Sequence, residues 1–149
     1  MLGPDDWQTF RDIRLAALKE APYAFASSWE NEKDHSEEDW RFGVTSRRRF
    51  VAFLDDRAVG MAAGGDSSYM GTAALTSLWV DPRARGHGIG DLLVAAVVEW
   101  AKGAGFNRLL LWVTEGNSHA EALYRRNGFQ RTGDVMHEPK REFEMARPL

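Results

Sequence analysis

Residues 75–90 constrain the fold of this chain more than any other segment. They predict a strand, a turn, a glycine-rich loop and then the start of a long helix. Three glycines at alternate positions, Gly86, Gly88 and Gly90, let the backbone approach a ligand without side chains in the way. Their N–H groups and the positive end of the helix form an anion site, where Arg85 can pair with phosphate. The segment therefore predicts a site for a phosphate-bearing ligand.

The composition excludes several other kinds of site. The chain has 149 residues and no cysteine, which excludes disulfides, thiolate catalysis and cysteine-based metal sites. Its four histidines show no metal-ligand spacing, so we expect no bound metal. The net charge of −3 argues against general nucleic-acid binding. There is no secretory start and no apolar run near the ~18 residues of a membrane helix, so we expect a cytoplasmic protein.

Hydrophobic periodicity predicts helix, helix, three strands, helix, strand, helix and two strands. The length suits one domain of residues 1–149. This order indicates an α/β fold, with helices on the faces of a mixed sheet. The expected elements are a helix from Pro4, a second helix after a capping box at 36–39, a hairpin of 49–54 and 58–63, a loop at 64–68, a strand at 73–80, a helix at 88–102, a strand at 108–114, a helix opened by a capping box at 118–121, and two strands within 129–145.

Two well-known phosphate-binding loops do not fit the glycine segment. A dinucleotide loop requires G-x-G-x-x-G, but the third glycine position holds Asp91, an acid that would face the pyrophosphate. A P-loop requires G-K-[ST], which is absent. The pattern that fits is [Q/R]-x-x-G-x-[G/A], filled by Arg85, Gly88 and Gly90 directly after a strand.

A second motif lies downstream, where Asn117, Tyr124 and Gly128-Phe129 form N-x₆-Y-x₃-G-F after the strand at 108–114. With both motifs the chain resembles the GNAT family of N-acetyltransferases, strongly over residues 73–132 and in element order over nearly its whole length. The resemblance implies a mixed, mostly antiparallel sheet of about six to seven strands, with splayed central strands and about four helices. It also implies acetyl-CoA as co-substrate.

The resemblance assigns most of the cofactor site to the glycine segment. It implies that the pantetheine arm lies between the splayed strands and pairs with the backbone of Leu78 and Val80. The N–H groups of the loop would hold the pyrophosphate. His87 protrudes from the loop, where it either touches phosphate or is solvated. The predicted cofactor-binding residues are Leu78, Trp79, Val80, Arg85, Gly86, His87, Gly88, Ile89, Gly90 and Asn117.

Two residues of the downstream motif carry candidate roles beside plainer interpretations. The resemblance implies that Asn117 reaches the pantetheine amides; the alternative is a turn residue before the helix. Tyr124 is the candidate catalytic acid, because the CoA thiolate needs a proton and a phenol with a pKa near ~10 can donate one. The alternative for Tyr124 is a core residue. Gly128 and Phe129 are structural in either case.

The general base is not assigned. Relatives often carry a glutamate on the strand before the loop, but Thr76, Ser77 and Leu78 stand there in this chain. Strict alternation would place Leu75, Ser77 and Trp79 on one face of that strand, and none of these is a base. A water relay, or an acid from elsewhere, would have to serve. Glu30, Glu32 and Glu115 are candidates.

The acceptor site is expected in the segment after the first helix and in loops near residues 64–71. There Phe25, Trp29 and Glu30 could hold a cationic amine, or the two aromatic residues could simply anchor the core. The preferred function is acetylation of a small-molecule or peptide amine. The alternatives are a protein N-terminal or lysine acetyltransferase, a non-catalytic acyl-CoA-binding module, and a nicotinamide-dependent enzyme. Oligomeric state is open, with a homodimer as one option.

Overall fold

The computed structural model describes residues 1–149. They form a six-stranded sheet in the order β1-β2-β3-β4-β6-β5, together with five α-helices and three short 3-10 helices. The elements are η1 (Pro4–Asp6), α1 (Trp7–Glu20), η2 (Pro22–Ala24), α2 (Trp29–Glu32), α3 (Glu37–Ser46), β1 (Arg48–Leu54), β2 (Arg57–Asp66), β3 (Thr72–Val80), η3 (Pro82–Ala84), α4 (Ile89–Gly103), β4 (Arg108–Thr114), α5 (Ser118–Arg126), β5 (Gln130–Met136) and β6 (Glu142–Pro148).

The predicted mixed α/β fold is confirmed. β3 and β4 run parallel, whereas β4–β6 and β6–β5 are antiparallel. The order of the strands and long helices matches the periodicity, and among the α-helices only the four-residue α2 was not predicted. None of the helices combines the length and hydrophobicity that a membrane span requires.

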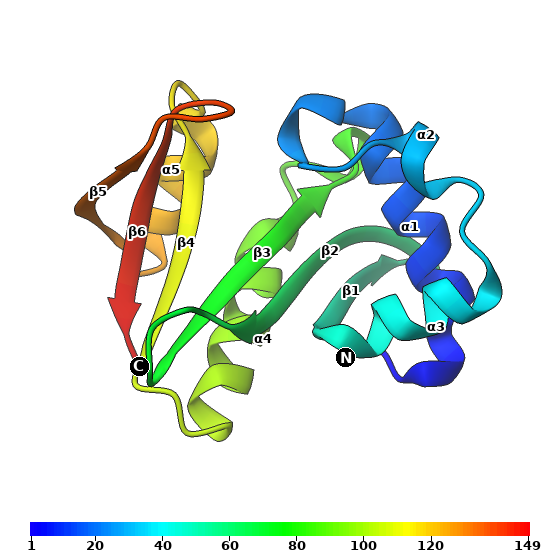
Figure 1. The fold of residues 1–149 in the computed structure, drawn as a ribbon, viewed down its shortest axis with the longest axis horizontal. Helices are drawn as coiled ribbons and strands as arrows, with labels where there is room; N and C mark the ends of the chain where they lie inside the picture. The colour runs from blue at the N-terminus through cyan, green and yellow to red at the C-terminus, as the bar shows by residue number, and fades with distance from the viewer. The chain divides into compact units, whose positions relative to one another are not determined.

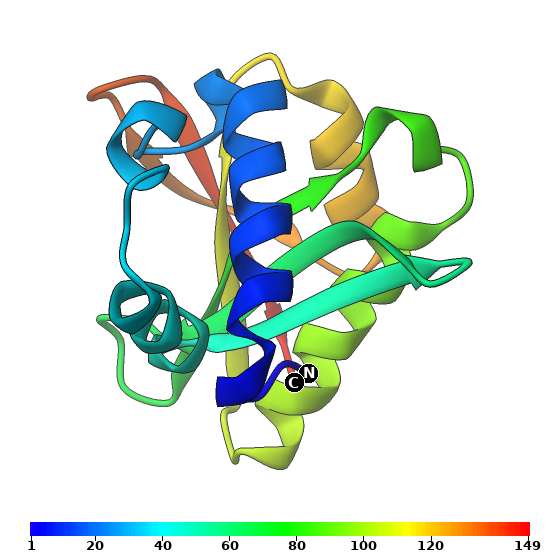
Figure 2. The same ribbon diagram turned by 90° about the vertical axis from the view of Figure 1, so that its right-hand side faces the viewer.

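The chain divides into two compact units. The first comprises residues 1–63 and 77–93. In it α1 lies across the β1–β2 hairpin (Figure 2). Apolar side chains recur at helical spacing on α1 and so form one stripe along the helix. This stripe is buried between α1 and the hairpin. This core cluster consists of Ile13 and Ala17 of α1, Ala21 directly after that helix, Met61 of β2 and Trp79 of β3.

Two predicted features of the first unit are confirmed with their local cause. Ser36 caps α3 by accepting a hydrogen bond from the Asp39 N–H, while Asp39 accepts one from the Ser36 N–H. The hairpin turns at Asp55 and Asp56, both in the left-handed region at φ 51° and 66°. Two successive left-handed residues are typical of a tight two-residue hairpin turn.

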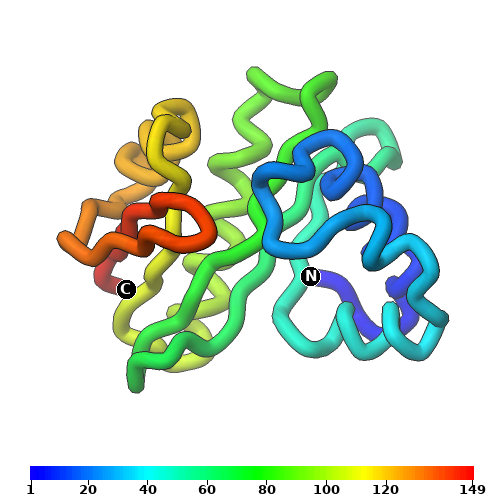
Figure 3. The backbone as a smooth tube through the Cα atoms, turned by 45° about the horizontal axis from the view of Figure 1, so that its top comes forward, coloured from blue at the N-terminus to red at the C-terminus, as the bar shows by residue number.

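The second unit comprises residues 64–76 and 94–149. Its strands β4, β6 and β5 lie side by side, with α5 behind them in the view of Figure 1. The trace in Figure 3 shows the C-terminal strand β6 returning along β4. Their register runs from Arg108 opposite Pro148 to Thr114 opposite Glu142.

The loop predicted at residues 64–68 is wrong at its start. β2 continues through Gly64 to Asp66. A Cβ atom at Gly64 would lie 2.7 Å from the ring of Trp100 on α4. Glycine is therefore needed here for close packing of a strand on a helix, and it does not mark a loop.

Candidate functional site

The glycine loop of the first unit joins η3 to α4. Gly86 and Gly88 have φ values of 86° and 73°, in the left-handed region that favours glycine. No atom lies within 4 Å of a Cβ built at either position. These glycines are thus required by backbone conformation and not by crowding. Helix α4 begins at Ile89, so its first N–H groups have no partner within the helix and suit an anion.

Arg85 stands at the edge of this loop with its side chain about half exposed. Its Nε donates a hydrogen bond to the Val80 carbonyl at 3.2 Å. Its Nη2 lies 3.8 Å from a carboxylate oxygen of Glu20. The other Glu20 oxygen accepts a hydrogen bond from the Trp79 indole at 2.7 Å. Glu20 therefore ties the end of α1 to both β3 and the loop.

Sequence reasoning did not find Glu20. Its partner Trp79 is 59 residues away in the chain, so no local motif joins the two. The one available signal is an acid in the last turn of a helix, where the helix dipole favours a base. An acidic side chain at this unfavourable position can indicate that it forms an ion pair or hydrogen bond with a residue of another element.

The histidine of the loop is exposed, and its Nδ1 lies 3.0 Å from the Ala84 carbonyl oxygen. That contact stays within the turn before α4. It agrees with the plainer of the two interpretations of His87, a loop residue in contact with solvent.

The strict alternation predicted for β3 is wrong from Ser77 onward. Ser77 has φ 58°, a left-handed conformation that is uncommon for a residue with a side chain. Such a residue inside a strand breaks the two-residue period, as in a β-bulge. Beyond it, the side chain of Trp79 is buried against α1. Only the backbone of Trp79 is therefore available for the predicted contact with the cofactor.

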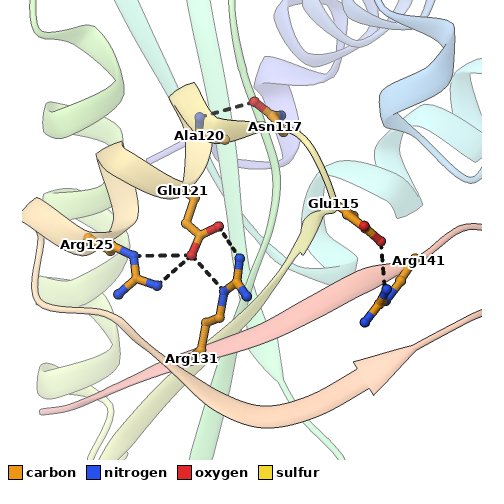
Figure 4. A network of polar contacts seen from close by, with 7 residues as sticks. All are labelled: Glu115, Asn117, Ala120, Glu121, Arg125, Arg131 and Arg141. Atoms are coloured by element: carbon orange, nitrogen blue, oxygen red, sulfur yellow. Dashed lines mark hydrogen bonds and ion pairs between the residues drawn. The ribbon is translucent and has the colours of Figure 1, made fainter.

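In the second unit, the capping box predicted at 118–121 is wrong. Ser118 is the first residue of α5, and Asn117 is the cap. The Asn117 side-chain oxygen accepts a hydrogen bond from the Ala120 N–H at 3.2 Å (Figure 4). Asparagine caps a helix as well as serine does, so Asn117 can be the cap although a serine follows it. A structural role for Asn117 is thus shown, while its cofactor role stays a prediction.

Tyr124 lies on α5 and is buried, and the centre of its ring lies 6.0 Å from the centre of the Phe129 ring in an edge-to-face arrangement. Burial raises the pKa of its phenol to about 12, since the charged phenolate is disfavoured away from water. The hydroxyl therefore stays protonated through the neutral range. This protonation state is the one that a proton donor needs.

Glu121 links helix α5 to strand β5 through hydrogen bonds (Figure 4). Its carboxylate accepts two hydrogen bonds from Arg131 at 2.8 Å, and Arg125 adds another at 2.7 Å. The hydrogen bonds from Arg131 and then Arg125 outweigh partial desolvation and lower the pKa of Glu121 to about 2. This network fixes the helix that carries Tyr124.

We expect Glu121→Gln to destabilise the protein by roughly 1 kcal/mol at pH 7, because it removes the charge that the two arginines share. A lowered pKa contributes stability above the ordinary value of 4.5, and that contribution is lost as the pH falls toward about 2. Urea unfolding at several pH values should show the gap to wild type shrinking below pH 4.5. Glu99→Gln, at an exposed glutamate 3.9 Å from Lys102, is the control and should show no such trend.

The candidate acceptor residues lie in the first unit, and their aromatic faces already contact cations of the chain. The guanidinium of Arg14 lies 5.0 Å from the centre of the Phe25 ring. The Lys33 and Lys19 ammonium groups lie 4.8 and 5.4 Å from the centre of a Trp29 ring. Glu30 is exposed. These contacts support the interpretation of the two aromatic residues as anchors.

Two of the candidate bases are paired with arginines. Glu32 is buried and accepts two hydrogen bonds from Arg14, each at 3.1 Å. Burial acts to raise its pKa, but the hydrogen bonds from Arg14 and Ser27 outweigh it and the pKa is lowered. A carboxylate held in this way is a poor proton acceptor. Glu115 is about half exposed and lies 3.3 Å from Arg141 (Figure 4).

A cavity of about 280 Å³ lies where β4 begins and β6 ends, at the other end of β4 from Asn117. Its lining contains none of the predicted site residues. The lining residues are Asn107, Arg108, Ala146, Arg147 and Pro148.

Comparison with known proteins identifies the family. The model of the acetyltransferase (GNAT) family matches residues 7–129, so the chain belongs to this family. Among curated proteins, the mycothiol acetyltransferase of Salinispora arenicola is 46% identical over 55 residues. That match covers 36% of this chain but only 18% of the relative, so the chain spans a small part of the relative's length.

Solved structures show the same fold over the whole chain. The ribosomal-protein-alanine N-acetyltransferase of Brucella melitensis has a TM-score of 0.76 at 23% identity, with 99% of this chain and 97% of that chain covered. The PaiA N-acetyltransferase of Thermoplasma acidophilum, solved in complex with coenzyme A, has a TM-score of 0.72 at 21% identity. The match covers 99% of this chain and 96% of the Thermoplasma chain.

Proposed function

We propose that this chain is a single-domain N-acetyltransferase that transfers the acetyl group of acetyl-CoA to a primary amine. The observation that carries the proposal is the glycine loop, in which two left-handed glycines lead into the N-terminus of α4 within a GNAT-family chain. The groups present in the loop fit acetyl-CoA, because backbone N–H groups and the half-exposed side chain of Arg85 can bind its pyrophosphate.

In this proposal the N–H groups from Gly86 to Gly90 bind the pyrophosphate, and the backbone of Leu78 and Val80 pairs with the pantetheine arm. The amine nitrogen attacks the thioester carbonyl, the N–C bond forms, the C–S bond breaks, and the nitrogen loses one proton to solvent through a water relay. Tyr124 donates its proton to the departing thiolate, and the Val80 N–H stabilises the oxyanion. The reaction needs no covalent enzyme intermediate, which agrees with the lack of cysteine.

We propose a small-molecule or peptide amine as the acceptor. The curated relatives named mycothiol acetyltransferase match only part of this chain, so they support acetyl transfer, and the acceptor has to be found by experiment. A panel of amino acids, polyamines, aminoglycosides and peptides, with release of free CoA as the readout, tests the reaction. Mass spectrometry of candidate protein substrates tests the protein-acetylating alternative.

Binding can be tested before an acceptor is known. We expect acetyl-CoA and CoA to raise the melting temperature and NAD to leave it unchanged. Stabilisation by NAD alone would contradict the proposal. Stabilisation by CoA with no amine acetylated would favour a non-catalytic acyl-CoA-binding module.

We expect Arg85→Ala to weaken CoA binding by about tenfold, because it removes a charge-assisted contact to phosphate. The loss should be larger at low salt, where charges are less screened. Calorimetric titration of CoA at two salt concentrations measures both effects. Arg83→Ala removes the same charge two residues away, at an exposed side chain paired with Asp81, and should have a much smaller effect. Equal losses in the two variants would argue against a direct role for Arg85.

A further inference from the structure

The carboxylate of Glu20, the last residue of α1, is held in one orientation by strand β3. Its Oε2 accepts a hydrogen bond from the indole Nε1 of Trp79 at 2.7 Å. Trp79 is 7% exposed and belongs to the core cluster of the first unit, so packing fixes the donor. The second oxygen of the carboxylate, Oε1, therefore points in a defined direction.

That oxygen faces Arg85 at the edge of the glycine loop. Nη2 of Arg85 lies 3.8 Å from Oε1 of Glu20, and Nε donates a hydrogen bond to the Val80 carbonyl at 3.2 Å. Nε and Nη2 form one edge of the planar guanidinium group, which has five N–H donors in a fixed geometry. The opposite end of the group, which carries Nη1, is left for a ligand. Two parallel N–H donors at that end match two oxygens of a phosphate.

Arg83, the other arginine between β3 and α4, is held differently. Its guanidinium is paired with Asp81, only two residues away, and its side chain is 71% exposed. Arg85 is instead held between the end of α1 and the end of β3. An arginine side chain has many rotamers, and ordering them on binding lowers the affinity for a ligand. Contacts that order Arg85 in advance therefore favour binding.

From these contacts we infer that Glu20 is a positioning residue for Arg85, and that it orients the guanidinium for a phosphate-type anion at the glycine loop. Trp79 fixes Glu20, and Glu20 together with the Val80 carbonyl fixes Arg85. All four residues belong to the first unit. The identification of the anion as the pyrophosphate of CoA rests on the proposed function; the orientation of Arg85 by Glu20 does not.

Glu20 has two effects on an anion, and they are opposite in sign. Its negative charge repels the anion, whereas its contact with Arg85 orders the cation that binds it. The Glu20 side chain is a third exposed, so water screens its charge, and the guanidinium lies between the carboxylate and the end that carries Nη1. The ordering effect is therefore the larger one, and removal of the carboxylate charge weakens binding.

The test is a double-variant cycle on Glu20 and Arg85, with inorganic pyrophosphate and CoA as separate probes in calorimetric titrations. Glu20→Gln removes the charge but keeps a side-chain oxygen that can accept the indole hydrogen bond. We expect it to weaken binding of both probes by about threefold, the size of a partly exposed ion pair. In an Arg85→Ala background the same change should have no effect, because the side chain that Glu20 orients is gone.

Two measurements separate positioning from a general effect on the fold or the charge. Urea unfolding of each variant shows any loss of stability, and a purely structural role of Glu20 would weaken binding equally with and without the Arg85 side chain. Glu38→Gln removes the same charge at an exposed position on α3 and should bind both probes as the wild type does.

Tighter binding in Glu20→Gln would mean that the carboxylate competes with the anion, and would overturn the inference. Unchanged binding, or an equal loss in the two backgrounds, would overturn it as well. Binding of pyrophosphate without binding of CoA contradicts the proposed function alone, and the pyrophosphate cycle still judges Glu20. If the wild type binds neither probe, both the inference and the proposed function are wrong.

Discussion

Replacement of Tyr124 by phenylalanine should lower turnover by about 10²- to 10⁴-fold, the range of a general acid in catalysis. The affinity for CoA should hardly change. Phenylalanine keeps the ring that packs against Phe129 and removes only the hydroxyl. Because burial raises the pKa of that hydroxyl to about 12, it is protonated whenever the thiolate departs. Steady-state kinetics give the turnover, and calorimetric titration gives the affinity.

Thr45→Val is the control for this prediction. Thr45 is exposed on α3, a helix that carries none of the candidate site residues, so loss of its hydroxyl should leave both quantities unchanged. Equal losses of turnover and CoA affinity in Tyr124→Phe would indicate a binding role. No loss of either would remove Tyr124 from the reaction and leave it as a core residue.

The largest effect on stability is expected at Trp79. Trp79→Ala should cost about 3–5 kcal/mol of unfolding free energy, because a buried aromatic side chain is lost from the cluster between α1 and β2. Trp79→Phe should cost about 1–3 kcal/mol, because it keeps a ring but leaves Glu20 without its indole donor. Urea unfolding followed by circular dichroism measures both.

Phe42→Ala is the matched truncation for the tryptophan series. Phe42 is 73% exposed on α3, so its removal should change stability by no more than about 0.5 kcal/mol. A cost for Trp79→Ala similar to that of Phe42→Ala would mean that the core cluster described for the first unit is not formed in solution.

Much of the fold could be predicted from the sequence because its signals are local. The Ser36–Asp39 capping box lies within four residues, and the apolar face of α1 repeats at helical spacing. The glycine loop was likewise predicted from neighbouring residues, and Gly86 and Gly88 have the left-handed conformation that the motif requires. Where two local signals competed, as at Asn117 and Ser118, the sequence pattern chose the wrong cap.

The parts that could not be predicted depend on residues far apart in the chain. Glu20 meets Trp79 across 59 positions, and Glu32 meets Arg14 across 18. Periodicity says which face of an element is buried but not which polar side chain from another element will reach it. Glu144 shows this most clearly, because nothing near it in sequence indicates a buried carboxylate with one free oxygen.

The left-handed residue at Ser77 has a consequence for comparing this chain with its relatives. β3 follows one alternation up to Thr76 and another from Ser77 to Trp79. An alignment that matches apolar residues at every second position across this strand will therefore be out of step in one half. The two halves need separate anchors: Thr72 and Ala74 through their partners on β4, and Trp79 through its contacts with α1.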